Sequence, residues 1–309
     1  MRDITRFNVM DDLPSDCFDM LVASFANWLR KDYRFLYAEC LGVKIDRKGK
    51  SLGEVLQIDK GDILKTAYQN GLAVHIHPMT DMHMKELLCL LYQFNPLMAE
   101  LDEYDCNWRK NYQKLHRYHY ILLQRYEESE KQFICTDTYP TQDNLVLPIE
   151  FIMNHVRRVL CFWDNKKTVP APVPHLCLQS VFEKYRTKDE IGTVKDRMEW
   201  VAAHLGCWRI ANEIEGYEDV DLLYIPVIWK LKNIQWSYKQ FALFLSFIAQ
   251  DTSEISQVYV SEILACWEII VNAVSLNILR KSETLPVTTI RSNLRKAVYI
   301  EELMFEELR

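Results

Sequence analysis

The hydrophobic pattern changes period after Pro148, and this change constrains the fold more than any other feature of the sequence. Before it, short apolar runs typical of strands are mixed with helical patterns. After it, apolar residues recur only at helical spacing, in segments at 149–163, 176–185, 193–214, 222–249, 253–281 and 287–308. The sequence therefore predicts an α+β domain over residues 1–150, followed by a helical domain over 151–309.

The first domain is expected to hold an N-terminal helix and an antiparallel sheet. Apolar residues at helical spacing predict an amphipathic helix over about 16–31, with Ser15 or Asp16 as its N-cap. Two further helices are expected, near 61–70 and 82–94. Short apolar runs predict the strands, at 73–77, 97–101, 118–126, 132–137 and 144–149.

Composition narrows the range of functions. The 309 residues carry a formal net charge of -6, which disfavours nonspecific binding to nucleic acid. No uncharged apolar stretch of about 18 residues predicts a transmembrane helix, and acidic residues near the N-terminus disfavour a signal peptide. The nine cysteines include no CxxC pair, so reduced thiols in a cytoplasmic protein are expected.

Cys17 differs from the other cysteines because it lies at the predicted start of a helix. Cysteine attacks as the thiolate, and the unpaired N–H groups and the dipole at a helix N-terminus stabilise an anion. The other cysteines lie in apolar runs or loops, where the residue behaves as a small hydrophobe. Cys17 is therefore the candidate nucleophile, and a core cysteine on an amphipathic helix is the structural alternative.

A polar turn at 127–131 separates two predicted strands and indicates a β-hairpin. Opposed residues of an antiparallel pair lie equally far from the turn, so a turn centred on Glu128 places His119 directly opposite Asp137. A nucleophilic cysteine requires such an imidazole base with a carboxylate to orient it. His119 and Asp137 thus complete a candidate triad with Cys17, and a surface His–Asp pair without a catalytic role is the alternative.

Three blocks of the first 150 residues resemble the family of butirosin biosynthesis protein H, whose members are papain-like cysteine enzymes. The nucleophile block is SDCFDMLVASFANWL, the histidine block is PLMAELDEYDCNWRKNYQKLHRYHYILLQRYEE, and the aspartate block is ICTDTYP. The matching residues are Cys17, Asp102, Tyr104, Trp108, Tyr112, His116, His119 and Asp137.

The resemblance implies a papain-like fold for residues 1–150 and an amide-forming acyltransferase activity. Cys17 would take an acyl chain from the phosphopantetheine arm of an acyl or peptidyl carrier protein and pass it to a small amine, without ATP, in natural-product biosynthesis. Closthioamide-type synthesis with a diamine acceptor is the most specific form of this expectation. The alternatives are a cysteine peptidase or amidase on the same site and a catalytically inactive papain-like binding module.

The partners follow from this chemistry. No metal or other directly bound cofactor, no nucleic acid and no membrane is expected, and a homodimer is one expected assembly. The basic pair Arg157-Arg158 is a candidate contact for an acidic carrier protein, with solvated charge as the alternative.

One departure from the papain-like pattern concerns the oxyanion hole, because no Gln precedes Cys17. The backbone N–H of Cys17 can donate one hydrogen bond to the oxyanion. Asn8 and Ser15 are the candidates for a second donor.

Aromatic and histidine side chains near the triad are the other candidates. Tyr104, Trp108 and Tyr139 are expected to line an acyl-binding groove or to pack in the core, and His116 is expected beside the substrate, as the rival of His119 for the base.

Two further groups complete the candidates. Cys106 and Cys135 flank the same region. His75, His77 and His83 have a spacing that a zinc site could use, with a solvated strand face as the alternative.

Overall fold

A computed structural model describes residues 7–138, 141–165, 174–248 and 253–308, and it describes no side chains for 174–177 and 253–256. The chain divides into two compact units. The first, called the sheet unit, comprises Met1–Tyr33 and Ile63–Ala171. The second, called the helical unit, comprises Arg34–Asp62 and Pro172–Arg309. Each unit is described by itself.

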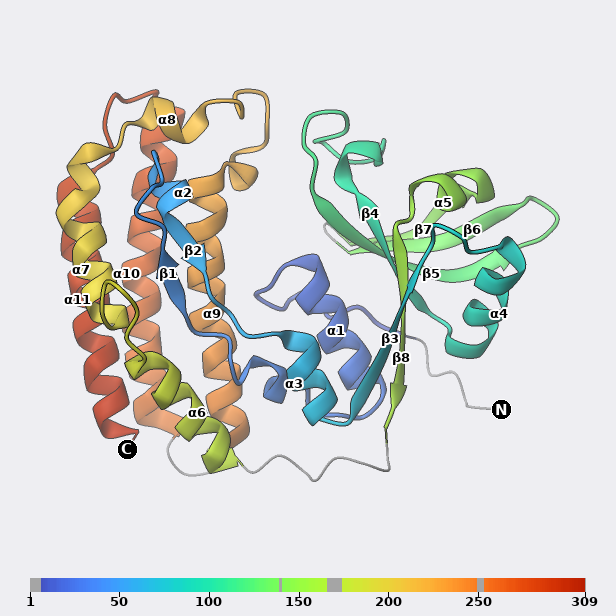
Figure 1. Ribbon diagram of the computed structural model, residues 1–309, viewed down its shortest axis with the longest axis horizontal. Coiled ribbons are helices and arrows are strands. Elements are labelled where there is room, and N and C mark those ends of the chain that lie inside the picture. Colours follow the sequence, from blue (N-terminus) through green and yellow to red (C-terminus); the bar gives the residue numbers. More distant parts are fainter. Residues whose placement is uncertain (1–6, 139–140, 166–173, 249–252, 309) are drawn as a thin grey trace. The chain divides into compact units, whose positions relative to one another are not determined.

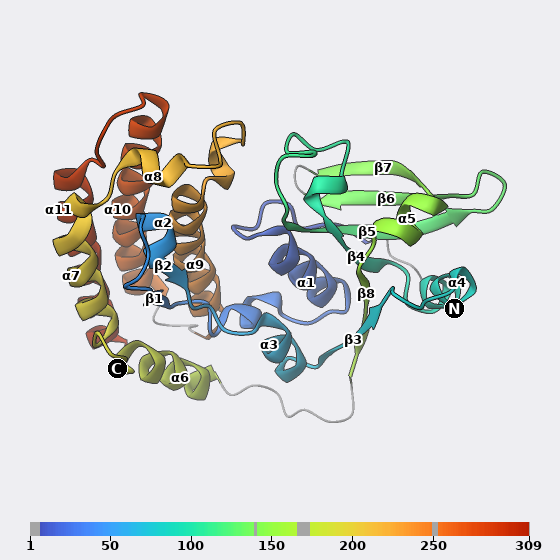
Figure 2. The ribbon, with the colours of Figure 1, turned by 45° about the horizontal axis from the view of Figure 1, so that its top comes forward.

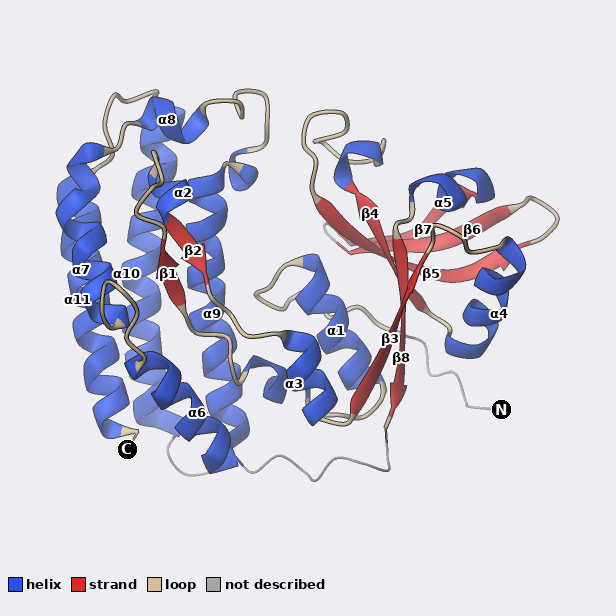
Figure 3. Ribbon diagram, viewed as in Figure 1, coloured by secondary structure: helices blue, strands red, loops and turns tan. Residues whose placement is uncertain are grey.

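The sheet unit is built on a six-stranded antiparallel sheet, shown in red in Figure 3. Its strands are β3 (Leu72–Pro78), β4 (Leu97–Asp102), β5 (Tyr118–Glu127), β6 (Gln132–Thr138), β7 (Thr141–Pro148) and β8 (Arg158–Asp164). Their order across the sheet is β3-β8-β4-β5-β6-β7, so the last strand in sequence lies between β3 and β4 (Figure 1).

Helices cover both faces of this sheet. On one face, α4 (Met84–Phe94) and α5 (Ile149–His155) bury Leu87 and Ile152 in a core with apolar residues of the strands. On the other face lies α1 (Cys17–Trp28), where Phe25 stacks on Phe162 of β8 at 4.3 Å between ring centroids. Helix α3 (Ile63–Gln69) packs beside α1.

Helix α1 begins where the sequence predicts, with Asp16 as its N-cap. The Asp16 carboxylate accepts a hydrogen bond from the Asp19 N–H at 3.0 Å. The helix is more deeply enclosed than an amphipathic pattern implies, because every residue from Asp19 to Ala26 is buried. Ser24 is satisfied inside this core, since its hydroxyl donates to the carbonyl of Met20 at 2.8 Å.

The helical unit confirms the helical character of the second half. Its long helices are α6 (Pro174–Arg186), α7 (Val194–His204), α9 (Pro226–Ile248), α10 (Ser253–Leu279) and α11 (Val287–Glu307). In both ribbon views α7, α9, α10 and α11 run side by side (Figure 1 and Figure 2). The predicted α+β class, with an antiparallel sheet and a helical C-terminal region, is confirmed.

The two compact units differ from the predicted domains, 1–150 and 151–309, at two places. Residues 34–62 belong to the helical unit and form β1 (Val43–Ile45), α2 (Leu52–Val55) and β2 (Leu56–Ile58) there. The reason is a long-range contact, because the buried carboxylate of Glu213 accepts hydrogen bonds from the N–H groups of Leu52 at 2.5 Å and Gly53 at 3.0 Å.

The second difference concerns residues 149–163, which were predicted to be one helix. The helix ends at His155 and the chain continues as β8. Residues 159–162 are buried on both faces of the sheet, so this run lacks the alternation that marks a half-buried strand.

The hairpin is present, but the predicted register is wrong. Ile121, not His119, lies directly opposite Asp137. Glu127 was assigned to the turn, whereas it pairs with Gln132 as the last residue of β5. A β-bulge between Leu123 and Arg125 shifts the register again.

One helical segment among the described residues, Gln257–Leu279 of α10, is long and apolar enough to cross a membrane by length and composition. A core helix of a soluble protein passes the same test. This segment packs against α9 and α11 within the helical unit.

Candidate active site

Cys17 is the first residue of α1; the residue is half-buried, and its thiol is free of any disulfide. The N–H groups of Cys17 and Phe18 lie in the first turn, where an α-helix offers them no intrahelical acceptor. The ring of Phe18 packs on that of Tyr120 in β5, with 4.9 Å between the ring centroids. This contact fixes the first turn of the helix against the sheet. A thiolate or an oxyanion at Cys17 therefore meets the positive end of a helix.

His119 and Asp137 lie side by side despite the changed register. Nε2 of His119 donates to Oδ1 of Asp137 at 2.9 Å, and both residues are buried. Because Ile121 is the direct partner of Asp137, His119 is its diagonal neighbour on the same face of the hairpin. The His119 side chain is also hydrogen-bonded to that of Cys17. The structure thus brings all three predicted residues together within the sheet unit.

The carboxylate of Asp137 is held from its other side by the loop before β5. Nε1 of Trp108 donates to Oδ2 of Asp137 at 2.6 Å. Arg109, whose side chain is buried, places Nη1 at 3.6 Å from Oδ1 of Asp137 and Nη2 at 3.5 Å from Oε1 of Glu103. Two carboxylates, one guanidinium and one imidazolium therefore balance each other's charge in this buried cluster.

These contacts change the proton affinities of the pair. Burial works against protonation of His119, but the hydrogen bonds to Asp137 and Cys17 outweigh it and raise its pKa to about 9. Burial would raise the pKa of Asp137, but the hydrogen bond and charge of His119, the charge of Arg109 and the Trp108 N–H together lower it. At neutral pH the imidazolium form of His119 is favoured, paired with an ionised Asp137.

This pair predicts a loss of stability at alkaline pH. The folded-state pKa of His119 lies above its ordinary value of 6.5, so its stabilising contribution is complete below pH 6.5 and disappears as the pH rises through about 9. We expect the free energy of unfolding to fall by ~3 kcal/mol over this interval on account of His119. Urea titrations across the interval measure the slope, and in the His119→Asn variant this contribution should vanish.

The predicted substrate-binding residues occupy different places. The ring of Tyr104 stacks on that of His116 at 4.1 Å, and Nδ1 of His116 lies 3.0 Å from Oδ2 of Asp102. His116 is largely exposed and holds a different carboxylate from His119, so the two histidines belong to separate clusters. Trp108 supports Asp137, as described above, and Tyr139 lies outside the described residues.

Two further cysteines near the hairpin are core residues. Cys106 and Cys135 are fully buried, and burial raises the pKa of each thiol well above its usual range. Cys106 is further held by the carbonyl of Asp102, to which its thiol donates at 3.4 Å. Neither thiol has the access to solvent that a nucleophile needs, which leaves Cys17 as the candidate.

The two candidate donors to the oxyanion hole differ in accessibility. The hydroxyl of Ser15 is enclosed by protein and has no hydrogen-bond partner among the described residues. A substrate oxygen cannot reach a hydroxyl that water cannot reach, so Ser15 does not suit this role in the present conformation. Asn8 is exposed. The first-turn amide of Cys17 and the Asn8 carboxamide are therefore the remaining candidates.

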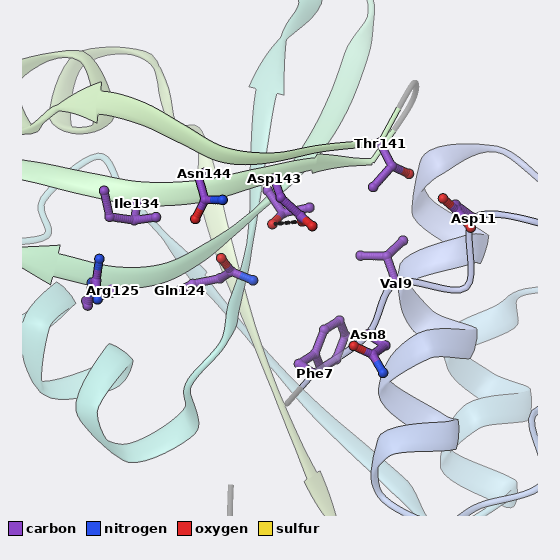
Figure 4. Close-up of a pocket in the computed structure, with 11 residues that line it drawn as sticks. Phe7, Asn8, Val9, Asp11, Gln124, Arg125, Ile134, Thr141, Asp143 and Asn144 are labelled. Carbon is purple, nitrogen blue, oxygen red and sulfur yellow. Dashed lines mark hydrogen bonds between the residues drawn. The ribbon is translucent and has the colours of Figure 1, made fainter. Parts of the chain in front are cut away.

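A cavity of about 490 Å³ lies over β5, β6 and β7 (Figure 4). The segment that leads to Cys17 forms one wall, and the strands form the other. In it Oγ1 of Thr136 donates to Oδ1 of Asp143 at 2.9 Å. Because Thr136 and Asp137 are consecutive in β6, the cavity lies on the face opposite to the Asp137 carboxylate. The lining residues are Phe7, Asn8, Val9, Asp11, Gln124, Arg125, Ile134, Thr136, Thr141, Asp143 and Asn144.

The histidines of β3 do not form a larger cluster. The rings of His75 and His77 contact each other at 4.1 Å, as their spacing predicts, and the backbone N–H of His83 is bound by Glu86 at the start of α4. Within the described residues, no three His, Cys, Asp or Glu side chains are arranged to hold a metal ion.

The basic pair is bound to acids of β4. Arg158 contacts Glu100, with Nη2 to Oε2 at 2.6 Å, and Arg157 contacts Asp102 over the same distance. Both arginines remain partly exposed. The Tyr120 hydroxyl donates to Oε2 of the same Glu100 at 2.5 Å. The ring of Tyr120 also contacts Phe18, so the Glu100 cluster adjoins the first turn of α1.

Sequence reasoning missed Arg109 and the supporting role of Trp108. Both residues lie in the loop between β4 and β5, in a stretch without periodicity. A buried arginine beside two acids is visible only in the folded chain.

No protein-family model matches this sequence, and no curated protein matches it.

Proposed function

We propose that this protein is a cysteine-dependent acyltransferase with a papain-like site, which makes amides from thioesters of a carrier protein. The observation that carries the proposal is the buried His119, hydrogen-bonded both to Asp137 and to the thiol of Cys17 at a helix N-terminus. Nucleophile, base and orienting group are the parts that acyl transfer through cysteine requires.

The first step is transthioesterification. The Cys17 thiolate attacks the thioester carbonyl, and the oxyanion that forms lies within reach of the first-turn N–H groups of α1. The carbon–sulfur bond to the pantetheine arm then breaks. The raised pKa of His119 suits it to the next event, because its imidazolium gives a proton to the departing thiol.

The second step is aminolysis. Neutral His119 takes a proton from the attacking amine as the new carbon–nitrogen bond forms. The carbon–sulfur bond to Cys17 breaks, the amide leaves, and the proton on His119 restores the imidazolium–thiolate pair. Conversion of a thioester to an amide is downhill, so the cycle consumes no ATP. The donor's phosphopantetheine arm takes part as substrate, and no resident cofactor is required.

The charge of the 490 Å³ cavity favours a diamine acceptor, because one ammonium group can bind there while the other amino group attacks in its neutral form. Asp11 and Asp143 both line it, and Arg125 is paired with Glu127 at 2.8 Å. Among the described residues neither carboxylate has a paired cation, and unpaired carboxylates raise the local concentration of positively charged ligands. The wall at residues 7–11 ends six positions before Cys17 in the chain, which supports a role of this cavity in the second step.

The Asp143→Asn variant tests the acceptor. Asparagine keeps an oxygen for the Thr136 hydroxyl and removes only the charge. We expect the KM for the amine to rise about 10-fold, from the loss of one charge-assisted interaction, with the rate of Cys17 acylation unchanged. Steady-state kinetics with varied amine measures the first, and quenched-flow acylation the second. Asp81→Asn, on the exposed surface, is the matched control. An unchanged KM would remove the cavity from the proposal.

Mass spectrometry tests the proposed function itself. After incubation with an acyl-loaded carrier protein or a simple acyl thioester, we expect one acyl adduct on Cys17. The adduct should be absent from Cys17→Ala, and the exposed Cys89 and Cys207 provide internal controls for nonspecific acylation. Amide should appear only when an amine is added. Hydrolysis without amine would instead indicate a peptidase or amidase, and absence of any adduct an inactive scaffold.

The cellular setting belongs to the same proposal. A thiolate nucleophile and free cysteines fit a reducing compartment, so we propose a cytoplasmic enzyme. The eight cysteines whose state the structure describes are all free thiols.

A further inference from the structure

Helix α10 carries a row of exposed residues with a seven-residue period. Val258, Ile269, Leu276 and Leu279 are large apolar residues of α10 with 58%, 46%, 48% and 65% of their surface exposed. The complete row, called the α10 stripe, is Val258, Glu262, Ala265, Ile269, Asn272, Leu276 and Leu279, all of them exposed.

The spacing within the α10 stripe alternates between four and three residues. Positions 258, 265, 272 and 279 repeat every seven residues, and so do 262, 269 and 276. A 4–3 alternation over three heptads keeps one narrow seam on a helix, which is the pattern of a coiled-coil contact. Core residues of a single bundle follow the wider stripe of period 3.6 instead.

The remaining surface of α10 is already used within the helical unit. Ile263, Trp267 and Ile270 are buried, and the helix packs against α9 and α11. The α10 stripe therefore lies outside the core, because its residues point away from these neighbours. An exposed apolar row of this length marks an interaction surface.

We propose that the α10 stripe is the contact between two copies of this chain, whose α10 helices pair antiparallel about a two-fold axis. With the axis between Ile270 and Val271, Ala265 of one copy faces Leu276 of the other. The pairing sets a small side chain against a large one in both symmetry-related positions. It also places Ile269 opposite Asn272, a polar residue of the kind that fixes register in a coiled coil.

Charge selects the antiparallel arrangement. In it, Glu262 of each copy lies beside Arg280 of the other, since Arg280 directly follows Leu279 at the far end of the stripe. A parallel pair would set Glu262 against Glu262 and Arg280 against Arg280. Opposite charges at both ends stabilise the first arrangement, and like charges at both ends disfavour the second.

The apolar surface extends beyond the C-terminal end of the stripe. A cavity of about 580 Å³, lined by Leu279 and by apolar residues such as Ile214, Val220 and Ile225, opens there. In the antiparallel pair, the other copy's Val258 lies just past the C-terminal end of α10, and Leu279 at that end lines this cavity. The start of one α10 therefore covers apolar surface at the end of the other.

The mass of the protein in solution tests this pairing. We expect sedimentation or light scattering to give twice 36.7 kDa for the unmodified chain at micromolar concentration. Leu276→Glu should weaken the dimer at least 100-fold, because two carboxylates enter an apolar seam. Tyr92→Glu is the matched control, since Tyr92 is 94% exposed on α4 and lies outside the stripe.

A charge reversal separates the orientation from a general loss of folding. Glu262→Arg alone should weaken the dimer, and adding Arg280→Glu should restore it. Failure of this rescue, with Leu276→Glu still monomeric, would overturn the antiparallel pairing. A monomeric unmodified chain, or a dimeric Leu276→Glu variant, would overturn the interface.

Binding of the α10 stripe to a membrane is tested separately. If the chain floats with vesicles of phosphatidylcholine and phosphatidylglycerol, and Leu276→Glu abolishes this, the stripe is a lipid-binding surface and the dimer is wrong. Acyl transfer by Cys17 is measured independently, so each proposal can fail without the other.

Discussion

Replacement of His119 by asparagine is expected to lower the rate of Cys17 acylation by about 1,000-fold, which is the range that a positioned acid–base group contributes. In the proposed reaction the imidazole takes the proton of the attacking thiol and returns a proton to the leaving thiol, and asparagine does neither. Quenched-flow kinetics with a small acyl thioester measures this step without the carrier or the amine. The binding of substrate should change little, so the loss should appear in the acylation rate.

His116→Asn is the matched control for this substitution. His116 lies three residues away, also contacts a carboxylate, and stacks on Tyr104, but it is exposed and binds Asp102 in place of Asp137. Its replacement should leave acylation unchanged. If the two variants were affected equally, or His116→Asn more strongly, the assignment of His119 as the base would be wrong.

The location of Cys17 is the part of the site that local sequence predicts best. A capping residue followed by apolar residues at helical spacing marks the start of α1, and the structure begins the helix at Cys17 behind Asp16. Capping is a local effect, so neighbouring residues suffice to predict it. Burial of α1 on every side is not local, and an amphipathic pattern does not predict the burial of polar residues such as Asp19 and Ser24.

The pairing of His119 with Asp137 was predicted from a register that the structure does not have. The prediction placed Glu127 in the turn and did not include the β-bulge after Leu123. Both errors preserve the face on which the two side chains lie, because the net shift is two residues. A diagonal pair remains close enough for a hydrogen bond. His119 and Asp137 are therefore neighbours, as predicted, although they do not lie directly opposite each other.

Long-range contacts explain what the sequence could not predict. The assignment of residues 34–62 to the helical unit depends on Glu213, more than 150 residues away, and no periodicity reveals it. The support of Asp137 by Trp108 and Arg109 depends in the same way on how one loop folds over β6. Local patterns thus located the candidate nucleophile, whereas the contacts that shift the pKa of His119 emerged only from the folded chain.

Replacement of Asp137 by asparagine is expected to lower acyl transfer by roughly 1,000- to 10,000-fold, as loss of the orienting acid does in related triads. Both carboxylate oxygens accept hydrogen bonds, one from Nε2–H of His119 and the other from Nε1–H of Trp108. Asparagine has one acceptor and one donor in their place. Its NH₂ group must face one of these N–H groups, and if it faces His119 it imposes the wrong tautomer.

The same substitution should also move the titration of His119. Asp137 is the largest influence that raises the pKa of His119 to about 9, so without its charge the pKa falls towards the ordinary 6.5 or below, because burial is no longer offset. Proton NMR of the His119 ring measures this shift directly. The alkaline loss of stability should disappear with it, because His119 contributes no linkage once its folded-state pKa has returned to the ordinary 6.5.

Asp105→Asn makes the same chemical change in a surface pair and is the control for Asp137→Asn. Asp105 binds His155 at 3.2 Å, with both side chains partly exposed, so solvent screens their attraction. Activity should remain unchanged in that variant. If Asp137→Asn retained full activity while the His119 titration moved as expected, the carboxylate would serve the fold and not the reaction, because orientation and charge would then both be dispensable for acyl transfer.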